Sequence, residues 1–61
     1  MSGKDKVRKF LEDNFNLSAF KIQDMPLFPN GVRLVDKENN AIVVYYDFLH
    51  DEVKYFFEEV K

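Results

Sequence analysis

The stretch 32-VRLVDKENNAIVVYY-46 decides the fold, because two apolar runs flank a polar segment with the composition of a tight turn. The runs Val32 to Val35 and Ala41 to Tyr46 are rich in the β-branched and aromatic residues that favour strands. The segment between them fits a type I turn that starts at Asp36 and has Asn39 in the left-handed conformation. The sequence therefore predicts a β-hairpin over residues 32–46.

The turn also fixes the register of this hairpin. With Asp36 opposite Asn40, the expected pairs are Val35 with Ala41, Leu34 with Ile42, Arg33 with Val43, and Val32 with Val44. One face is then wholly apolar, as a face packed on a core must be, and it carries Val32, Leu34, Ile42 and Val44. A shift by one residue would bring Arg33 onto a face with Val35 and Ile42, so we expect the first register. The other face then displays Arg33, Val35, Val43 and Tyr45, with Ala41 at its edge.

The residues before the hairpin predict a helix, a short strand and a loop. A helix is expected from about Gly3 to Asn14, capped by Ser2 with Asp5 completing a capping-box-like pair. Its apolar stripe consists of Val7, Phe10, Leu11 and Phe15. The alternation in Phe20 to Gln23 predicts a strand. The segment 24–31 has two prolines, which exclude a central strand, and its Pro29-Asn30-Gly31 suits positions i+1 to i+3 of a type I turn.

The residues after the hairpin predict a second helix, from about Phe48 to Val60. Asp47 is a good N-cap, and Asp51 and Glu52 fall in the first turn, where the helix dipole favours anions. The expected buried stripe is Leu49, Val53, Phe56, Phe57 and Val60. The predicted fold is therefore α+β in the order α-β-β-β-α: a single domain over residues 1–61, with a three-stranded antiparallel sheet and both helices packed on one face.

Length and composition limit the class of protein. The 61 residues make one domain at most, and with no Cys and one His the chain has no disulfide, thiolate zinc site or His cluster. A core of this size is small, so the seven Phe and three Tyr, or dimerisation, must compensate.

Composition also bears on location and origin. The longest apolar run, Ala41 to Tyr46, is far shorter than the ~20 residues of a membrane span. The charged N-terminus does not resemble a signal peptide. We therefore expect a cytoplasmic protein with no membrane partner. The abundance of Phe, Tyr, Ile, Asn and Lys suggests an AT-rich genome, bacterial or phage.

Two surfaces are candidates for binding a partner protein. The outer face of the hairpin mixes apolar residues with an Arg and a Tyr, as modest protein interfaces do, and its candidate residues are Arg33, Val35, Val43 and Tyr45. β-propensity alone also favours Val and Tyr there. The second candidate is the proline-flanked loop with Leu27 and Phe28, which suits either a stiff recognition loop or a lid over one end of the core.

Charge suggests an alternative, nucleic-acid binding. Residues 1–9 carry Lys4, Lys6, Arg8 and Lys9 against one Asp, and cations at a helix N-terminus oppose the macrodipole. The expected order of elements resembles that of double-stranded-RNA-binding domains. Those domains present lysines at the start of the second helix, where this chain reads 47-DFLHDE-52 and would repel phosphate. The net charge of −2 also makes nucleic acid a poor partner.

Catalysis has one candidate group, His50, which lies close in sequence to Asp47, Asp51 and Lys54. A solvated His in the first turn of a helix is commonplace, and the chain is short for building a pocket that excludes water. We therefore expect no enzymatic activity, no metal site and no cofactor. The preferred function is a small protein-interaction module (an adaptor, inhibitor or accessory protein) whose partner is another protein or a second copy of itself.

Overall fold

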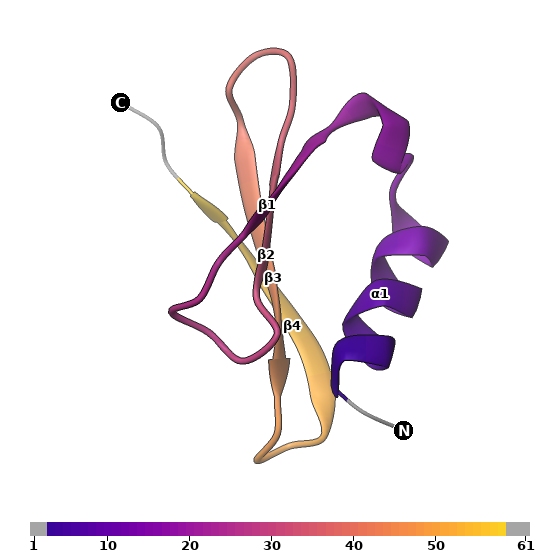
Figure 1. The fold of residues 1–61 in the computed structure, drawn as a ribbon, viewed down its shortest axis with the longest axis vertical. Coiled ribbons are helices and arrows are strands. Elements are labelled where there is room, and N and C mark those ends of the chain that lie inside the picture. Colours follow the sequence, from indigo (N-terminus) through magenta and orange to yellow (C-terminus); the bar gives the residue numbers. More distant parts are fainter. Residues whose placement is uncertain (1–2, 59–61) are drawn as a thin grey trace.

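The computed structural model describes residues 3–58, which form one α-helix, one 3₁₀ turn and four β-strands. The elements are α1 (Gly3–Asn14), η1 (Leu17–Ala19), β1 (Lys21–Asp24), β2 (Val32–Val35), β3 (Ala41–Asp47) and β4 (Glu52–Glu58). The strands form one antiparallel sheet in the order β1-β2-β3-β4, so each pairs with its neighbour in the sequence. In Figure 1, α1 lies on one side of this sheet and the loop 25–31 lies on the other. The α+β class is confirmed.

The helix α1 spans the residues that the sequence predicted. Val7 and Leu11, one turn apart, are its buried residues, and Phe10 and Phe15 pack against the same core. Ser2, the expected cap, lies outside the described residues. Gly3 lies so close to the Tyr46 ring that a Cβ at this position would overlap it. Because these apolar residues lie on one side of α1 and pack against the core, the apolar stripe determines which side of α1 faces the sheet.

The β2–β3 hairpin has the predicted register, with Leu34 opposite Ile42 and Arg33 opposite Val43. The Asp36 carboxylate accepts hydrogen bonds from the backbone N–H of Glu38 at 2.8 Å and of Asn40 at 2.9 Å. Asn39 has a φ of 65°, the left-handed conformation that its type tolerates. The hydrogen bonds of Asp36 and the left-handed conformation of Asn39 thus set the pairing of the two strands.

The strand β1 begins one residue later than predicted, and the loop 25–31 after it consists of two consecutive turns. Phe28 N–H donates to the Met25 carbonyl at 3.3 Å, and Gly31 N–H donates to the Phe28 carbonyl at 3.0 Å. Asn30, with a φ of 52°, gives the second turn the positive φ of type II rather than the expected type I. Tyr46 N–H donates to the Pro29 carbonyl at 3.0 Å and ties the loop to β3.

The prediction of a second helix over residues 48–60 is wrong for the residues that the structure describes, 48–58. Residues 48–51 form a turn, and β4 follows, paired with β3 from Asp47 opposite Glu52 to Ala41 opposite Glu58. Asp47 does cap backbone N–H groups, those of Leu49 at 3.0 Å and His50 at 3.3 Å, but it caps a tight turn. The predicted order α-β-β-β-α is therefore wrong. The described residues form a four-stranded sheet in place of the predicted three-stranded one, and a single α-helix in place of two helices packed on one face. The described residues therefore do not have the order of elements that is found in double-stranded-RNA-binding domains.

The burial of β3 explains why a fourth strand forms. Ala41, Ile42, Val43 and Val44 are all buried, although successive side chains of a strand point to opposite faces. A strand covered on both faces is a central strand, and its backbone needs a hydrogen-bonded neighbour at each edge. β2 supplies one neighbour, and β4 supplies the other along all seven residues of β3.

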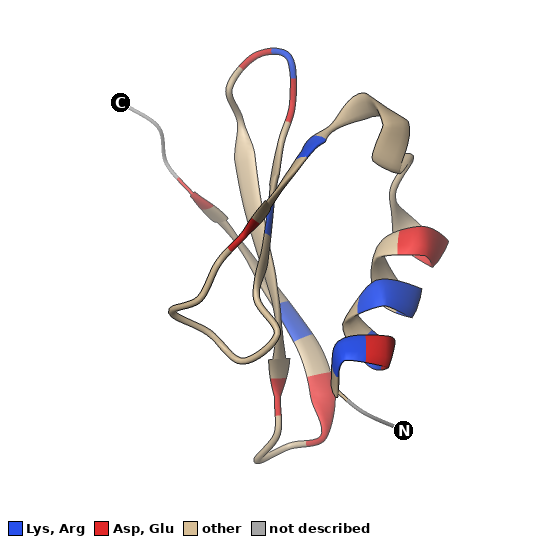
Figure 2. Ribbon diagram, in the orientation of Figure 1, with Lys and Arg blue, Asp and Glu red and all other residues tan. Residues whose placement is uncertain are grey.

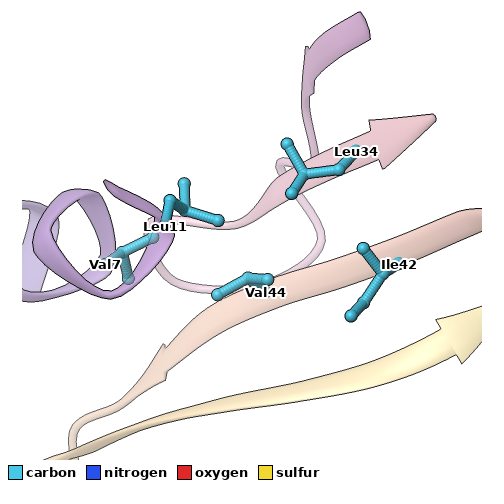
Figure 3. Packing of buried hydrophobic residues seen from close by; sticks show 5 residues of the cluster. All are labelled: Val7, Leu11, Leu34, Ile42 and Val44. Carbon is cyan, nitrogen blue, oxygen red and sulfur yellow. The ribbon is translucent and has the colours of Figure 1, made fainter. Parts of the chain in front are cut away.

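The main core lies between α1 and the sheet. Figure 3 shows side chains from α1, β2 and β3 directed toward one another, and the cluster consists of Val7, Leu11, Leu34, Ile42 and Val44. α1 packs against β3 and β4 and leaves β1 and β2 less covered on this inner face. On the outer face, Val43 is also fully buried, at 0% exposure. The sheet therefore buries apolar side chains on both of its faces.

Candidate partner-binding surfaces

The outer face of the sheet carries the residues that the sequence assigned to it, and it is more covered than expected. The alternation of β2 and β3 directs Arg33, Val43 and Tyr45 away from α1. Val43 is buried because Arg33 and Phe56 lie opposite it on the two neighbouring strands, so it is not available to contact a partner. Val35 is half-buried on β2.

An aromatic cluster lies over this face. The Phe28 ring, from the loop 25–31, is 4.9 Å from the Tyr45 ring and 5.5 Å from the Phe56 ring, and the last two are 6.2 Å apart. Leu27, next to Phe28 in the loop, is 84% exposed. We call Leu27, Phe28, Tyr45 and Phe56 the outer patch. Sequence reasoning missed Phe56 because it placed this residue in a helical stripe, although the alternation of β4 directs it to the outer face.

The rim of the outer patch is polar and internally paired. Arg33 Nε donates to Glu58 Oε1 at 2.8 Å, and its NH1 group donates to Gln23 Oε1 at 2.8 Å. Lys54 Nζ lies 3.0 Å from Asp47 Oδ2, and the hydrogen bond between these two groups is the main reason that the pKa of Lys54 is raised. The two cations nearest the patch are therefore neutralised within the chain.

The free edge of β4 is a second candidate, which the sequence did not indicate. Among residues 3–58, five of the seven exposed large apolar residues fall between residues 48 and 57, namely Phe48, Leu49, Tyr55, Phe56 and Phe57. On the inner face, Tyr55 stacks on Phe10 of α1 at 5.9 Å but remains 54% exposed. Phe57 is 75% exposed. We call the unpaired side of β4, with Tyr55, Phe56 and Phe57, the β4 edge.

Two of the four basic residues of α1 form ion pairs within the chain. The Lys6 ammonium pairs with Asp51 in the turn 48–51, and this hydrogen bond raises the pKa of Lys6. Arg8 donates to Asp5 at 3.1 Å, and Lys4 and Arg8 line a groove of about 440 Å³ between α1 and β1–β2. Figure 2 shows acidic residues on α1 and on the strands beside these cations. Nucleic-acid binding through Lys4, Lys6, Arg8 and Lys9 stays a prediction.

His50 lies in a cluster of charges at the turn 48–51. Its Nδ1 is 2.7 Å from Asp47 Oδ2, and Asp47, His50 and Glu52 have ligand atoms within 4.8 Å of one another. Lys54 Nζ already lies 3.0 Å from Asp47 and 3.8 Å from Glu52, where a cation would be attracted. Lys54, and then His50, hold the pKa of Asp47 well below its usual range. The cluster is an exposed network of ion pairs and hydrogen bonds that holds the turn.

Comparison of this chain with protein-family models, curated proteins and solved structures gives no match. Within residues 3–58, the one helix that the structure describes is too short and too polar to cross a membrane. The function must therefore be argued from the surfaces themselves.

Proposed function

We propose that this chain is a small protein-interaction module that binds a partner protein through its outer patch. It acts as an adaptor, inhibitor or accessory protein in the cytoplasm and carries out no catalytic step. The observation that carries the proposal is the aromatic cluster of Phe28, Tyr45 and Phe56, with the 84% exposed Leu27 beside it. Aromatic residues surrounded by a polar rim are typical of the centre of a protein interface.

The loop that presents Leu27 and Phe28 is held in place before any partner arrives. The Met25 N–H donates to the Gly31 carbonyl at 3.0 Å, and the two inner turns and the Tyr46–Pro29 bond anchor the remainder. A Cβ at position 31 would overlap the Met25 carbonyl oxygen, so glycine permits this closure. A loop ordered in advance loses little conformational entropy on binding, which favours affinity.

The charges around the patch favour a protein partner with apolar side chains. Arg33 is bound to Glu58 and Gln23, and Lys54 is bound to Asp47, so a phosphate group would have to displace these partners. An aliphatic or aromatic side chain meets no such competition beside Leu27 and Phe28. The proposed partner therefore inserts apolar side chains against the outer patch and leaves the rim hydrated.

The test is a photo-crosslinking and pull-down comparison in a lysate of the source organism. Leu27→Asp places a charge in the outer patch, and Ile22→Asp makes the same kind of change at an exposed apolar residue (56%) on the opposite face of the sheet. We expect the original chain and Ile22→Asp to capture one discrete protein, and Leu27→Asp to lose it by about tenfold or more, the effect of one interface hot spot. Capture that is unchanged by Leu27→Asp, or no capture at all, contradicts the proposal.

A further inference from the structure

We propose that two copies of this chain associate through the β4 edge, each adding its strand antiparallel to the other, to form one continuous sheet of eight strands. The proposed interface shares Phe56 with the outer patch but does not involve Leu27, Phe28 or Tyr45. It rests on three observations: an unpaired edge strand, aromatic side chains on both faces of that strand, and a pattern of charges that is complementary to itself.

The β4 edge is less protected than the β1 edge, although it carries the charged residues Glu52, Lys54 and Glu58. β4 lies at the end of the sheet and spans seven residues, so one row of its backbone N–H and C=O groups has no strand partner among the described residues. β1, at the other end, is four residues long with Lys21 and Asp24 at its termini, which is the short, charged type of edge that resists pairing. The middle of β4 instead reads Tyr55-Phe56-Phe57, which favours strand addition.

One symmetric register of β4 pairs opposite charges and also keeps the aromatic residues of both copies within the paired strands. With Phe56 on the two-fold axis, Lys54 faces Glu58 of the second copy, Tyr55 faces Phe57, and Phe56 faces Phe56. Moving the axis to Tyr55 places Glu52 opposite Glu58, and moving it to Lys54 places Lys54 opposite Lys54. Moving it to Val53 places Lys54 opposite Glu52, but residues 55–57 then face the turn 48–51 instead of a strand. Like charges directly opposite each other destabilise a strand pair, whereas opposite charges and aromatic pairs stabilise it.

This register also buries the apolar surface that the single chain exposes. On the inner face, Tyr55 and Phe57 of both copies lie together beside the two α1 helices, and Tyr55 is already stacked on Phe10. On the outer face, the two Phe56 rings meet at the axis. The main core cluster holds five buried residues among those that the structure describes, so the added burial compensates for a small core.

The proposal predicts a charge-reversal and rescue pattern in analytical ultracentrifugation over micromolar to millimolar concentrations. The original chain dimerises, and Lys54→Glu weakens the dimer by about tenfold because both symmetric pairs become repulsive. The double variant Lys54→Glu with Glu58→Lys dimerises several-fold more tightly than Lys54→Glu alone, although it also loses the ion pairs of Lys54 with Asp47 and of Glu58 with Arg33 within each chain. Lys37→Glu, the same charge change in the β2–β3 turn, leaves the dimer unchanged. Leu27→Asp also leaves it unchanged, which separates this proposal from the proposed function.

A second measurement tests the register without charge changes. The chain has no Cys, so Phe56→Cys introduces a single thiol on the proposed two-fold axis, and Lys37→Cys provides a matched control. Under mild oxidation we expect a covalent dimer from Phe56→Cys and little from Lys37→Cys. A chain that stays monomeric at millimolar concentration, folded charge variants without rescue, or equal crosslinking by both thiols would overturn the proposal.

Discussion

At the residue scale, Val43 shows that the outer face of the sheet is a covered surface. The sequence predicted that Val43 is exposed to solvent, because the alternation of side chains along the hairpin directs it away from the main core. The alternation is correct, but Arg33 and Phe56 flank Val43 across the sheet and leave it 0% exposed. The missing information was the neighbour on the far side, Phe56, which belongs to a strand that the sequence assigned to a helix.

We expect Val43→Ala to lower the free energy of unfolding by ~2 kcal/mol, because it removes two buried methyl groups and leaves a cavity. Val35→Ala is the matched control on the same face, and we expect it to cost less than ~1 kcal/mol because Val35 is half-buried. Urea unfolding of both variants measures the difference. Equal losses would show that Val43 is no better covered than Val35.

The contact of Asp51 with Lys6 and Tyr46 predicts a loss of stability in acid. Lys6, and then Tyr46, lower the pKa of Asp51 through hydrogen bonds. The unfolded chain then takes up this proton more readily than the folded chain, so protonation favours unfolding. The contribution of Asp51 is present above its ordinary pKa of ~3.9 and is lost as the pH falls through the lower folded value.

The variant Asp51→Asn tests this contribution, because Asn tolerates the left-handed φ of 50° at this position and removes the charge. We expect it to be less stable than the original chain at pH 7, and the difference to disappear as the pH falls below the lowered pKa of Asp51 in the folded chain. Lys6→Gln should produce the same loss, and the double variant no further loss, because the two residues act as a pair. Parallel unfolding curves at all pH values would contradict the assignment.

At the element scale, α1 and the β2–β3 hairpin were predictable and β4 was not. The stripe of Val7 and Leu11 and the polar turn from Asp36 each favour one local structure. Residues 52–58 fit two periodicities, since Val53, Phe56 and Phe57 suit a helix while Val53, Tyr55 and Phe57 suit a strand. The deciding contribution is tertiary: β3, buried on both faces, needs a hydrogen-bonded neighbour at its second edge.

Two substitutions at the exposed Phe57 distinguish a strand from a helix, because the more stable of the two variants differs between these structures. In a strand, Phe57→Thr should be more stable than Phe57→Ala by up to ~1 kcal/mol, because β-branched residues fit a pleated surface. In a helix, Ala would be the more stable by ~0.5 kcal/mol. Thermal unfolding at low micromolar concentration, where self-association does not contribute, gives the answer. A more stable Phe57→Ala would contradict the strand.

At the scale of the whole molecule, one helix is too little to cover a four-stranded sheet. α1 packs on β3 and β4, and the loop 25–31 covers part of the outer face. Among the described residues, the apolar surfaces that remain include Ile22 on the inner face of β1, the outer patch and the β4 edge. The position of Leu27 and Phe28 in a loop and of Tyr45 on the outer face could be predicted from the sequence, because prolines and strand alternation are local signals. The β4 edge depends on which strand lies last in the sheet, which no local pattern encodes.

The most direct measurement is amide hydrogen exchange of residues 53–57 as a function of protein concentration. In dilute solution we expect alternate amides to be protected, those that bond to β3, while the amides on the free side exchange rapidly. At millimolar concentration the second set becomes protected as well. Uniform protection of consecutive amides at all concentrations, as in a helix, or a free side that never becomes protected would contradict an exposed, self-pairing β4.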